Sequence, residues 1–241
     1  EKPLKPMWLY MYGFSDAHDT FADFKDAKLF HSDYATEYLG ALLVSASLIP
    51  APRPVNAVSD IAWASEPPAI GVFLWLDVYE LLEVLGNDSS GKLRISLRCA
   101  GHEAVVSSRI AYKHRRAAAY TSLPALSVTV PRNARSRPDV LVVVQERSVL
   151  RYVDRAFARF PLNDLLAAGR KAKPAWHHLR PMEPTFDGDN FAGLALFKLT
   201  AGDEAKEHRF PRRFDLVKPD LDPHILRVHV YQGRDLAPTL D

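Results

Sequence analysis

The chain has few cysteines and no long apolar runs, the features on which disulfide frameworks and membrane helices depend. Its 241 residues include one cysteine, Cys99, so no disulfide can form within the chain, and a reducing compartment is the simplest environment for it. No run of about 18 consecutive apolar residues is present, and we therefore expect no helix that crosses a bilayer. Cys99 follows an alternating strand pattern, which indicates a packing role for it and not a catalytic one.

Motifs of common enzyme chemistry are also missing from the sequence. There is no Gly-x-Ser-x-Gly, no phosphate-cradling glycine loop, no His-Glu-x-x-His and no dinucleotide fingerprint. Asp and Glu residues lie mostly in predicted loops and form no evident acid–base pair. His177 and His178 are adjacent, so on a strand they point to opposite faces and cannot share a metal ion. We therefore expect that the chain is not an enzyme and holds no zinc.

The net charge is only +2, but the charges are unevenly distributed along the chain. Residues 92–173 contain 17 Lys and Arg against 5 Asp and Glu, a net charge of +12, whereas residues 1–91 carry −8 and residues 174–241 carry −2. A basic segment between acidic flanks points to a polyanionic partner such as phospholipid head groups, nucleic acid or an acidic protein. The alternative is that the oppositely charged segments neutralise each other within the fold.

Strand patterns dominate the sequence. Residues 92–98 alternate strictly between polar and apolar side chains, which predicts a half-buried strand with a basic outer face. Val140–Val144 is a continuous apolar run, typical of a central strand that is covered on both sides. About eight such strands within roughly 130 residues favour an all-β fold, an antiparallel β-sandwich. Further strands are predicted at residues 72–79, 104–112, 126–130 and 155–162, and one helical turn at Asn163–Gly169.

The beginning and the end of the chain are similar in sequence. Lys5-Pro6-Met7-Trp8 precedes the strand-like run Gly40–Leu48, and Lys173-Pro174-Ala175-Trp176 precedes Gly193–Leu199. A proline-bearing gap and a further apolar strand follow in both places. Self-similarity at a fixed long period, here 168 residues between the two tryptophans, indicates an array of similar domains. The alternative is a chance recurrence of tryptophan beside an apolar strand.

Two segments carry a resemblance to a known family. Ile225–Leu236 resembles the opening strand of a C2 domain in the ferlin family, and it contains the motif Tyr231-Gln232-Gly233-Arg234-Asp235-Leu236. Phe157–Leu166 followed by Trp176-His177-His178-Leu179 resembles the last part of a C2 domain. Ferlins are multi-C2-domain proteins of membrane fusion and repair, and the middle of the chain resembles their divergent C2 domain through its strand order.

The resemblance implies an eight-stranded antiparallel C2-like β-sandwich with flanking segments from neighbouring C2 units. Either Gly40–Leu48 or Gly193–Leu199 completes this sandwich, and we favour the second. The predicted divisions are residues 1–50 as the tail of a preceding unit with a connecting strand, 51–69 as a proline-rich linker, 70–201 as the divergent C2 domain, 202–223 as a charged linker and 224–241 as the first strand of the next C2 domain.

In C2 domains that bind calcium, the resemblance implies two loops that supply converging carboxylates. Asp88 matches the first position of the first loop, but the second position supplies no carboxylate. In the third loop, predicted at Val144–Ser148, Glu146 replaces an aspartate, while Arg147 and Arg151 add positive charge. At a few ångströms each such charge opposes a cation by about 1–4 kcal/mol. We therefore expect degenerate calcium loops at Asp88 and Glu146, with no metal and no other cofactor.

A basic cluster is predicted on strand 92–98, on its hairpin partner and in the run that follows. In many C2 domains such a patch binds inositol phospholipid heads, and the resemblance implies the same role here. Each cation near an anionic leaflet contributes on the order of 1 kcal/mol, so four or five suffice for weak binding. The alternative is a strand face that is solvated or paired within the molecule. The predicted phospholipid-binding residues are Lys92, Arg94, Arg98, Arg109, Lys113, Arg115 and Arg116.

The sequence thus predicts a membrane-association and scaffold region of a ferlin-like protein, acting in vesicle docking, membrane fusion, exocytosis or membrane repair. We expect it to bind anionic phospholipid without calcium, on the cytoplasmic face of a vesicle or the plasma membrane. Neighbouring C2 domains and fusion-machinery proteins are further expected partners. We do not expect nucleic acid as a partner, because few aromatic residues lie near the basic run. The alternatives are a β-sandwich that binds a protein partner, and a C2 accessory domain of a lipid-modifying enzyme.

Overall fold

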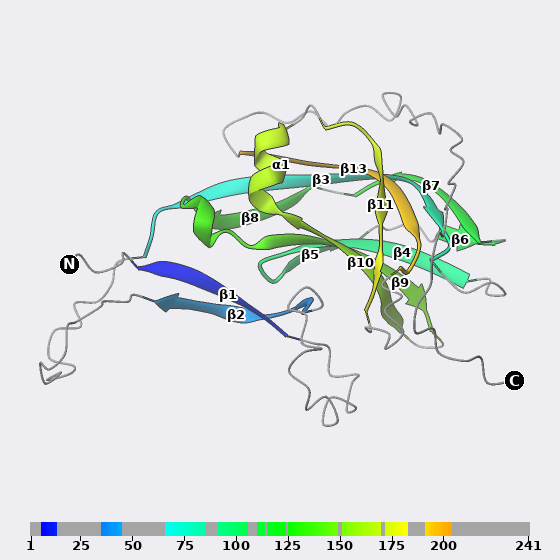
Figure 1. The fold of residues 1–241 in the computed structure, drawn as a ribbon, viewed down its shortest axis with the longest axis horizontal. Helices are drawn as coiled ribbons and strands as arrows, with labels where there is room; N and C mark the ends of the chain where they lie inside the picture. The colour runs from blue at the N-terminus through cyan, green and yellow to red at the C-terminus, as the bar shows by residue number, and fades with distance from the viewer. Residues whose placement is uncertain are drawn as a thin grey trace, which may run out of the picture.

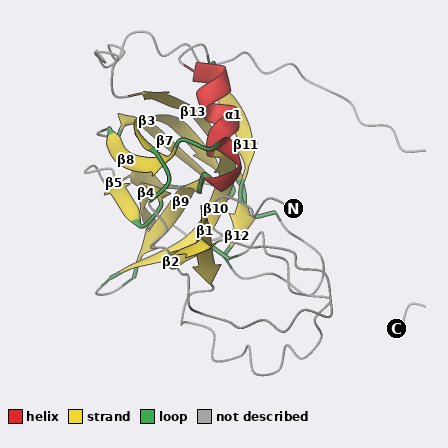
Figure 2. Ribbon diagram, turned by 90° about the vertical axis from the view of Figure 1, so that its left-hand side faces the viewer, coloured by secondary structure: helices red, strands yellow, loops and turns green. Residues whose placement is uncertain are grey.

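The described part of the chain forms three layers, namely two packed β-sheets and a two-stranded hairpin against the outer face of one of them (Figure 1 and Figure 2). No helix within this part is long and apolar enough to cross a bilayer. The computed structural model describes residues 6–13, 35–44, 66–84, 91–105, 110–113, 115–123, 125–148, 151–169, 172–182 and 191–203.

The first sheet, sheet I, is built around the 14-residue strand β3 (Ala69–Leu82). β13 (Leu194–Asp203) pairs with β3 along most of its length, and β11 (Ala175–His178) pairs with the far edge of β13. β7 (Arg116–Ser122) and β8 (Leu126–Pro131) follow one another along the other edge of β3. All of these pairings are antiparallel.

The second sheet, sheet II, has β4 (Gly91–Cys99) and β9 (Asp139–Arg147) at its centre. β10 pairs with β9, while β5 and β6 share the free edge of β4. If β5 and β6 are counted as one interrupted strand, and β7 and β8 as another, the two sheets supply eight strand positions beside the two-residue β12. The remaining bounds in this sheet are β5 (His102–Val105), β6 (Ile110–Tyr112), β10 (Tyr152–Pro161) and β12 (Arg180–Pro181).

The packing confirms the predicted all-β antiparallel sandwich. Leu93, Ile95 and Leu97 of β4 are at most 1% exposed in the core between the sheets, as their alternation predicts. Val140–Val144 is buried on both sides, because Leu141 and Val143 lie in a second small apolar cluster on the outer face of sheet II. The predicted helical turn is also present as α1 (Leu162–Ala168), and a 3-10 turn lies at Ala134–Ser136.

The strand near Gly193–Leu199 is the one that completes the sandwich, as we favoured. β13 lies beside β3, whereas β2 (Glu37–Val44) pairs only with β1 (Met7–Gly13) within the described residues. The predicted linkers fall largely outside the described residues, and the strand at residues 225–231 falls there entirely. The five predicted divisions of the chain therefore stay predictions.

The β1–β2 hairpin is seated on the outer face of sheet II. Tyr12 and Tyr38 pack against each other, with ring centres 5.8 Å apart, on the side of the hairpin that faces the sheet. Arg159 of β10 donates a hydrogen bond to the carbonyl oxygen of Ala35, and its guanidinium lies 5.6 Å from the centre of the Tyr12 ring. Tyr38 lies so close to the β4–β5 turn that a Cβ at Gly101 would come within 2.7 Å of its ring. The hairpin thus covers part of this face.

Candidate functional site

The outer face of sheet II carries a shallow groove at the end where β4 begins and β6 and β9 finish. Its volume is about 670 Å³, and Lys92, Lys113 and Arg147 on its rim are all exposed. We call this feature the basic groove. Among the residues that the structure describes, no carboxylate lines the groove; the lining residues are Gly91, Lys92, Ala111, Tyr112, Lys113, Arg147 and Ser148.

Strand alternation explains why these three cations point the same way. Lys92 precedes the core residue Leu93 on β4, and it lies opposite Ala111 of β6. Lys113 follows the buried Tyr112, so it too faces outward. Side chains two residues apart on a strand share a face. Three elements distant in sequence therefore bring positive charge to one place.

The turn between β9 and β10 closes one side of the basic groove. The backbone N–H of Ser148 donates to the carbonyl oxygen of Arg151 at 2.8 Å, which holds the turn tight. The Arg151 side chain is exposed. Close cations raise each other's energy unless an anion lies between them, so this end of the molecule favours a polyanionic ligand.

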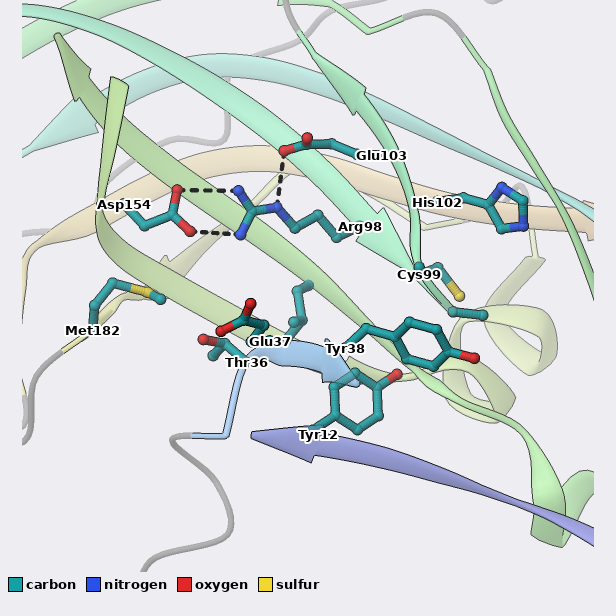
Figure 3. A pocket seen from close by; sticks show the side chains of 13 residues that line it. Tyr12, Thr36, Glu37, Tyr38, Arg98, Cys99, His102, Glu103, Asp154 and Met182 are labelled. Atoms are coloured by element: carbon teal, nitrogen blue, oxygen red, sulfur yellow. Dashed lines mark hydrogen bonds and ion pairs between the residues drawn. The ribbon is translucent and has the colours of Figure 1, made fainter. Parts of the chain in front are cut away.

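Arg98, a predicted phospholipid ligand, is instead paired within the fold. Its guanidinium donates to both carboxylate oxygens of Asp154, at 2.5 and 3.1 Å, and its Nε donates to Glu103 at 2.8 Å (Figure 3). Burial alone would lower the pKa of Arg98, but its hydrogen bonds and charge pairing with Asp154 and Glu103 outweigh burial and raise the pKa. These residues line a pocket of about 420 Å³ between the hairpin and sheet II.

Arg94 is held by the same polar network. Its Nε donates to the side-chain oxygen of Gln145 at 2.5 Å, and the amide nitrogen of Gln145 donates to Asp154 at 2.5 Å. The guanidinium also lies over the ring of Tyr152, 3.9 Å from the ring centre. For Arg94 and Arg98, the structure thus shows the pairing within the molecule that we considered as an alternative.

The other predicted cations take different positions. Arg115 forms an ion pair with Glu83 at 3.1 Å, and Arg116 forms one with the buried carboxylate of Glu80. Arg109 lies outside the described residues. Of the seven predicted residues, Lys92 and Lys113 are the two that the structure places at the basic groove.

The predicted calcium loops are only partly described. Asp88 lies outside the described residues. Glu146 was expected in a loop, but it lies on β9, opposite Val153, because the strand continues to Arg147. Its carboxylate accepts a hydrogen bond from the Nε of Arg155 at 2.7 Å. No three His, Cys, Asp or Glu side chains in the described part of the chain converge as a metal site would require.

Sequence reasoning missed two features of this face. Arg147 was considered only as an obstacle to calcium, although its spacing from Gln145 places it on the outer face beside Lys92. Asp154, the partner of Arg98, lies 56 residues away on another strand. Alternation within one strand reports which face a side chain takes, but it does not report the partner that a neighbouring strand presents.

Comparison with known proteins gives likeness of structure without likeness of sequence. No protein-family model matches the chain, and no curated protein matches its sequence. The structure is similar to a C2 domain of a plant extended synaptotagmin 1, with a TM-score of 0.42 and 9% identity over 58% of this chain and 99% of that one. A C2 domain-containing protein follows with a TM-score of 0.39 and 11% identity, covering 59% of this chain and 98% of its own. PLC21 of L. pealei has a TM-score of 0.38 and 8% identity, covering 61% of this chain and 17% of its own.

Proposed function

We propose that this chain is a C2-like module that associates with membranes by binding anionic phospholipid head groups in the basic groove, without calcium. One observation carries the proposal: Lys92, Lys113 and Arg147 line a groove at which the described residues supply no carboxylate. Phosphate oxygens of head groups match lysine and arginine donors in charge and in hydrogen-bonding capacity.

The expected affinity of the basic groove for an anionic membrane fits a module that binds together with other modules of the same protein. Each cation near an anionic leaflet contributes on the order of 1 kcal/mol, so the three cations of the groove give about 3 kcal/mol and weak, reversible binding. Modules linked in one protein gain affinity through effective concentration. We therefore propose a scaffold role within a ferlin-like protein, in vesicle docking, membrane fusion, exocytosis or membrane repair on the cytoplasmic face. The proposed role is not enzymatic.

Vesicle co-sedimentation tests the proposal. Vesicles of phosphatidylcholine with phosphatidylserine, with or without phosphoinositide, are mixed with the chain at two salt concentrations. We expect the double variant Lys92→Glu/Lys113→Glu to bind at least about tenfold more weakly, because two attractive charges become repulsive. Binding of the unmodified chain is expected to fall as salt rises.

A matched pair of charge reversals controls for net charge. Arg132→Glu/Lys173→Glu changes the same total charge at exposed positions away from the groove, and we expect it to bind within about twofold of the unmodified chain. Equal binding by both double variants would show that the basic groove is not the lipid site. Absence of binding to any vesicle would favour a module that binds a protein partner.

A further inference from the structure

The β1–β2 hairpin has a second, apolar face that points away from sheet II. Leu9 lies directly opposite Leu42, and Met11 lies two residues further along the same face. Leu39 contacts the position of Gly13, which lies two residues beyond Met11, so it shares this face. Leu9, Met11, Leu39 and Leu42 are 47%, 37%, 62% and 51% exposed. We call these four side chains the apolar ribbon face.

The hairpin cannot rotate to bury the apolar ribbon face without breaking its contacts with sheet II. Its opposite side carries Tyr12 and Tyr38, which pack together beside the β4–β5 turn and line the pocket above sheet II. Arg159 fixes the same side through the Ala35 carbonyl oxygen. The apolar ribbon face is therefore held outward by contacts on the reverse of the same two strands.

The apolar ribbon face and the basic groove look toward the same side of the molecule. The hairpin lies beyond sheet II on the side away from sheet I in both views (Figure 1 and Figure 2), and the cations of the basic groove stand on the outer face of sheet II. Packed sheets lie about 10 Å apart, so the hairpin extends about one such layer further than the groove. That step is close to the roughly 5–10 Å by which interfacial segments enter the boundary between head groups and acyl chains.

We propose that the apolar ribbon face inserts into the acyl-chain boundary of an anionic bilayer whose head groups occupy the basic groove. The part that concerns the groove rests on the proposed function above, whereas the insertion stands on the hairpin alone. Trp8 and Tyr10 alternate with Leu9 and Met11 along β1 and are half-buried on the reverse side of the strand, where Tyr10 packs against Tyr38.

A bilayer fits this face better than a second copy of the chain does. A stable dimer buries about 800 Å² on each partner, and four partly exposed side chains supply only a fraction of that area. An apolar patch of a few hundred Å² is large enough to be functional on a monomer. Insertion into a bilayer needs no complementary protein surface, so a small convex patch suffices.

A fluorescent label reports insertion directly, because the chain offers no competing thiol. Cys99 is 2% exposed, and burial raises the pKa of its thiol to about 12, so we expect it to react far more slowly with the label than an exposed thiol does. Leu39→Cys places one reactive thiol on the apolar ribbon face, and Thr129→Cys places one on an exposed position of β8 in sheet I as the matched control. Each variant carries an environment-sensitive NBD group and is mixed with phosphatidylcholine–phosphatidylserine vesicles.

We expect the label at Leu39→Cys to shift to the blue, to brighten severalfold and to be quenched by brominated acyl chains, while the label at Thr129→Cys stays unchanged. In a second experiment, Leu9→Asp/Leu42→Asp should weaken vesicle partitioning by about tenfold or more. Because the altered residues are exposed, an unchanged melting temperature identifies this loss as lost insertion. The Lys92→Glu/Lys113→Glu variant should still show the blue shift at high lipid concentration, which separates insertion from charge attraction.

An unshifted label at Leu39→Cys on protein that co-sediments with vesicles would overturn the insertion and leave the basic groove standing. A shift that appears without vesicles as protein concentration rises, with a dimer in sedimentation velocity, would overturn it in favour of a second copy of the chain.

Discussion

At the scale of single residues, Arg98 shows how a cation that looks available in a sequence becomes structural. Its guanidinium and Asp154 are about three-quarters buried, at 26% and 24% side-chain exposure. We expect Arg98→Met to lower the free energy of unfolding by about 2–4 kcal/mol, because it leaves the largely buried carboxylate of Asp154 without its main partner. Urea unfolding measures this loss.

The matched control for that prediction is Arg151→Met, which removes an exposed arginine from the neighbouring turn. Its expected effect is below about 0.5 kcal/mol, as for most surface substitutions. If Arg98→Met cost no more than Arg151→Met, the ion pair with Asp154 would contribute nothing to stability, and Arg98 would again be a candidate for lipid binding.

His177 gives a prediction about pH. It stacks on Phe197 with ring centres 4.2 Å apart and meets Phe160 edge-on, and burial there lowers its pKa below the usual 6.5. The unfolded chain therefore takes up a proton here at a higher pH than the folded chain does. The stabilisation by neutral His177 is fully present above pH 6.5 and is lost as pH falls below it toward the folded pKa.

We therefore expect the melting temperature to fall less between pH 7.5 and pH 5.5 in His177→Phe than in the unmodified chain. Phenylalanine keeps the ring contacts and removes the titrating group. His178→Gln, at the exposed neighbouring position, serves as the control. An equal fall in the unmodified chain and in His177→Phe would mean that His177 does not contribute to acid sensitivity.

At the scale of elements, the join between β3 and β13 depends on one glycine. Gly193 has φ +110°, and a Cβ there would lie 2.6 Å from the carbonyl oxygen of Leu82 and 2.8 Å from the backbone N of Val84. Backbone atoms cannot move aside as the end of a side chain can. We expect Gly193→Ala to cost about 3 kcal/mol or more in unfolding free energy.

Gly169, which ends α1, is the natural comparison because its φ is also positive, at +55°, and no atom lies within 4 Å of the Cβ position. Gly169→Ala should therefore cost only about 1 kcal/mol, from backbone conformation alone. Thermal or urea unfolding of the two variants separates crowding from conformation. Similar losses in both would show that the crowding at Gly193 relaxes cheaply.

Periodicity made the individual strands predictable, but not what lies against them. The alternation of residues 92–98 and the apolar run Val140–Val144 each predicted correctly which faces of the strand are buried. The spacing of apolar residues along a strand depends directly on whether one or both of its faces are buried. The sequence left open whether β2 or β13 joins the sandwich, since both are apolar strands of similar length. That choice depends on long-range pairing.

The candidate site was predictable to a similar extent. Lys92 and Lys113 were expected on the outer face and lie there, at the basic groove. Arg94 and Arg98 were expected on the same face and also lie there, but Gln145 and Asp154 of neighbouring strands engage them. The cover supplied by the hairpin had no signal in the sequence, since its contact with sheet II depends on tertiary packing.

At the scale of the whole molecule, the three layers place an apolar surface and a basic surface on the same side, beyond sheet II. The hairpin covers part of the outer face of sheet II and presents apolar side chains, while the end of that face with the basic groove keeps its cations exposed. The ion pairs of Arg98, Arg115 and Arg116 show that part of the basic segment is neutralised internally. The three cations of the basic groove, by contrast, stay exposed.

This arrangement makes a prediction about calcium. The one described carboxylate from the predicted calcium loops, Glu146, is engaged by Arg155, and Lys92, Lys113 and Arg147 stand at the same end of the sandwich. A divalent cation would meet several positive charges, each of which opposes it by about 1–4 kcal/mol. We therefore expect 1 mM calcium to leave the melting temperature and vesicle binding of the chain unchanged relative to EGTA.

The measurement is sensitive enough to decide, because a ligand present at 100 times its dissociation constant stabilises a protein by about 2.7 kcal/mol, which shifts a melting temperature by several degrees. Calcium that binds with a dissociation constant near 10 μM would therefore be visible in a thermal scan and as heat in titration calorimetry. Such a result would place carboxylates of the loop around Asp88 close enough to overcome the surrounding cations. It would also turn the basic groove from a direct head-group site into the flank of a calcium-bridged one.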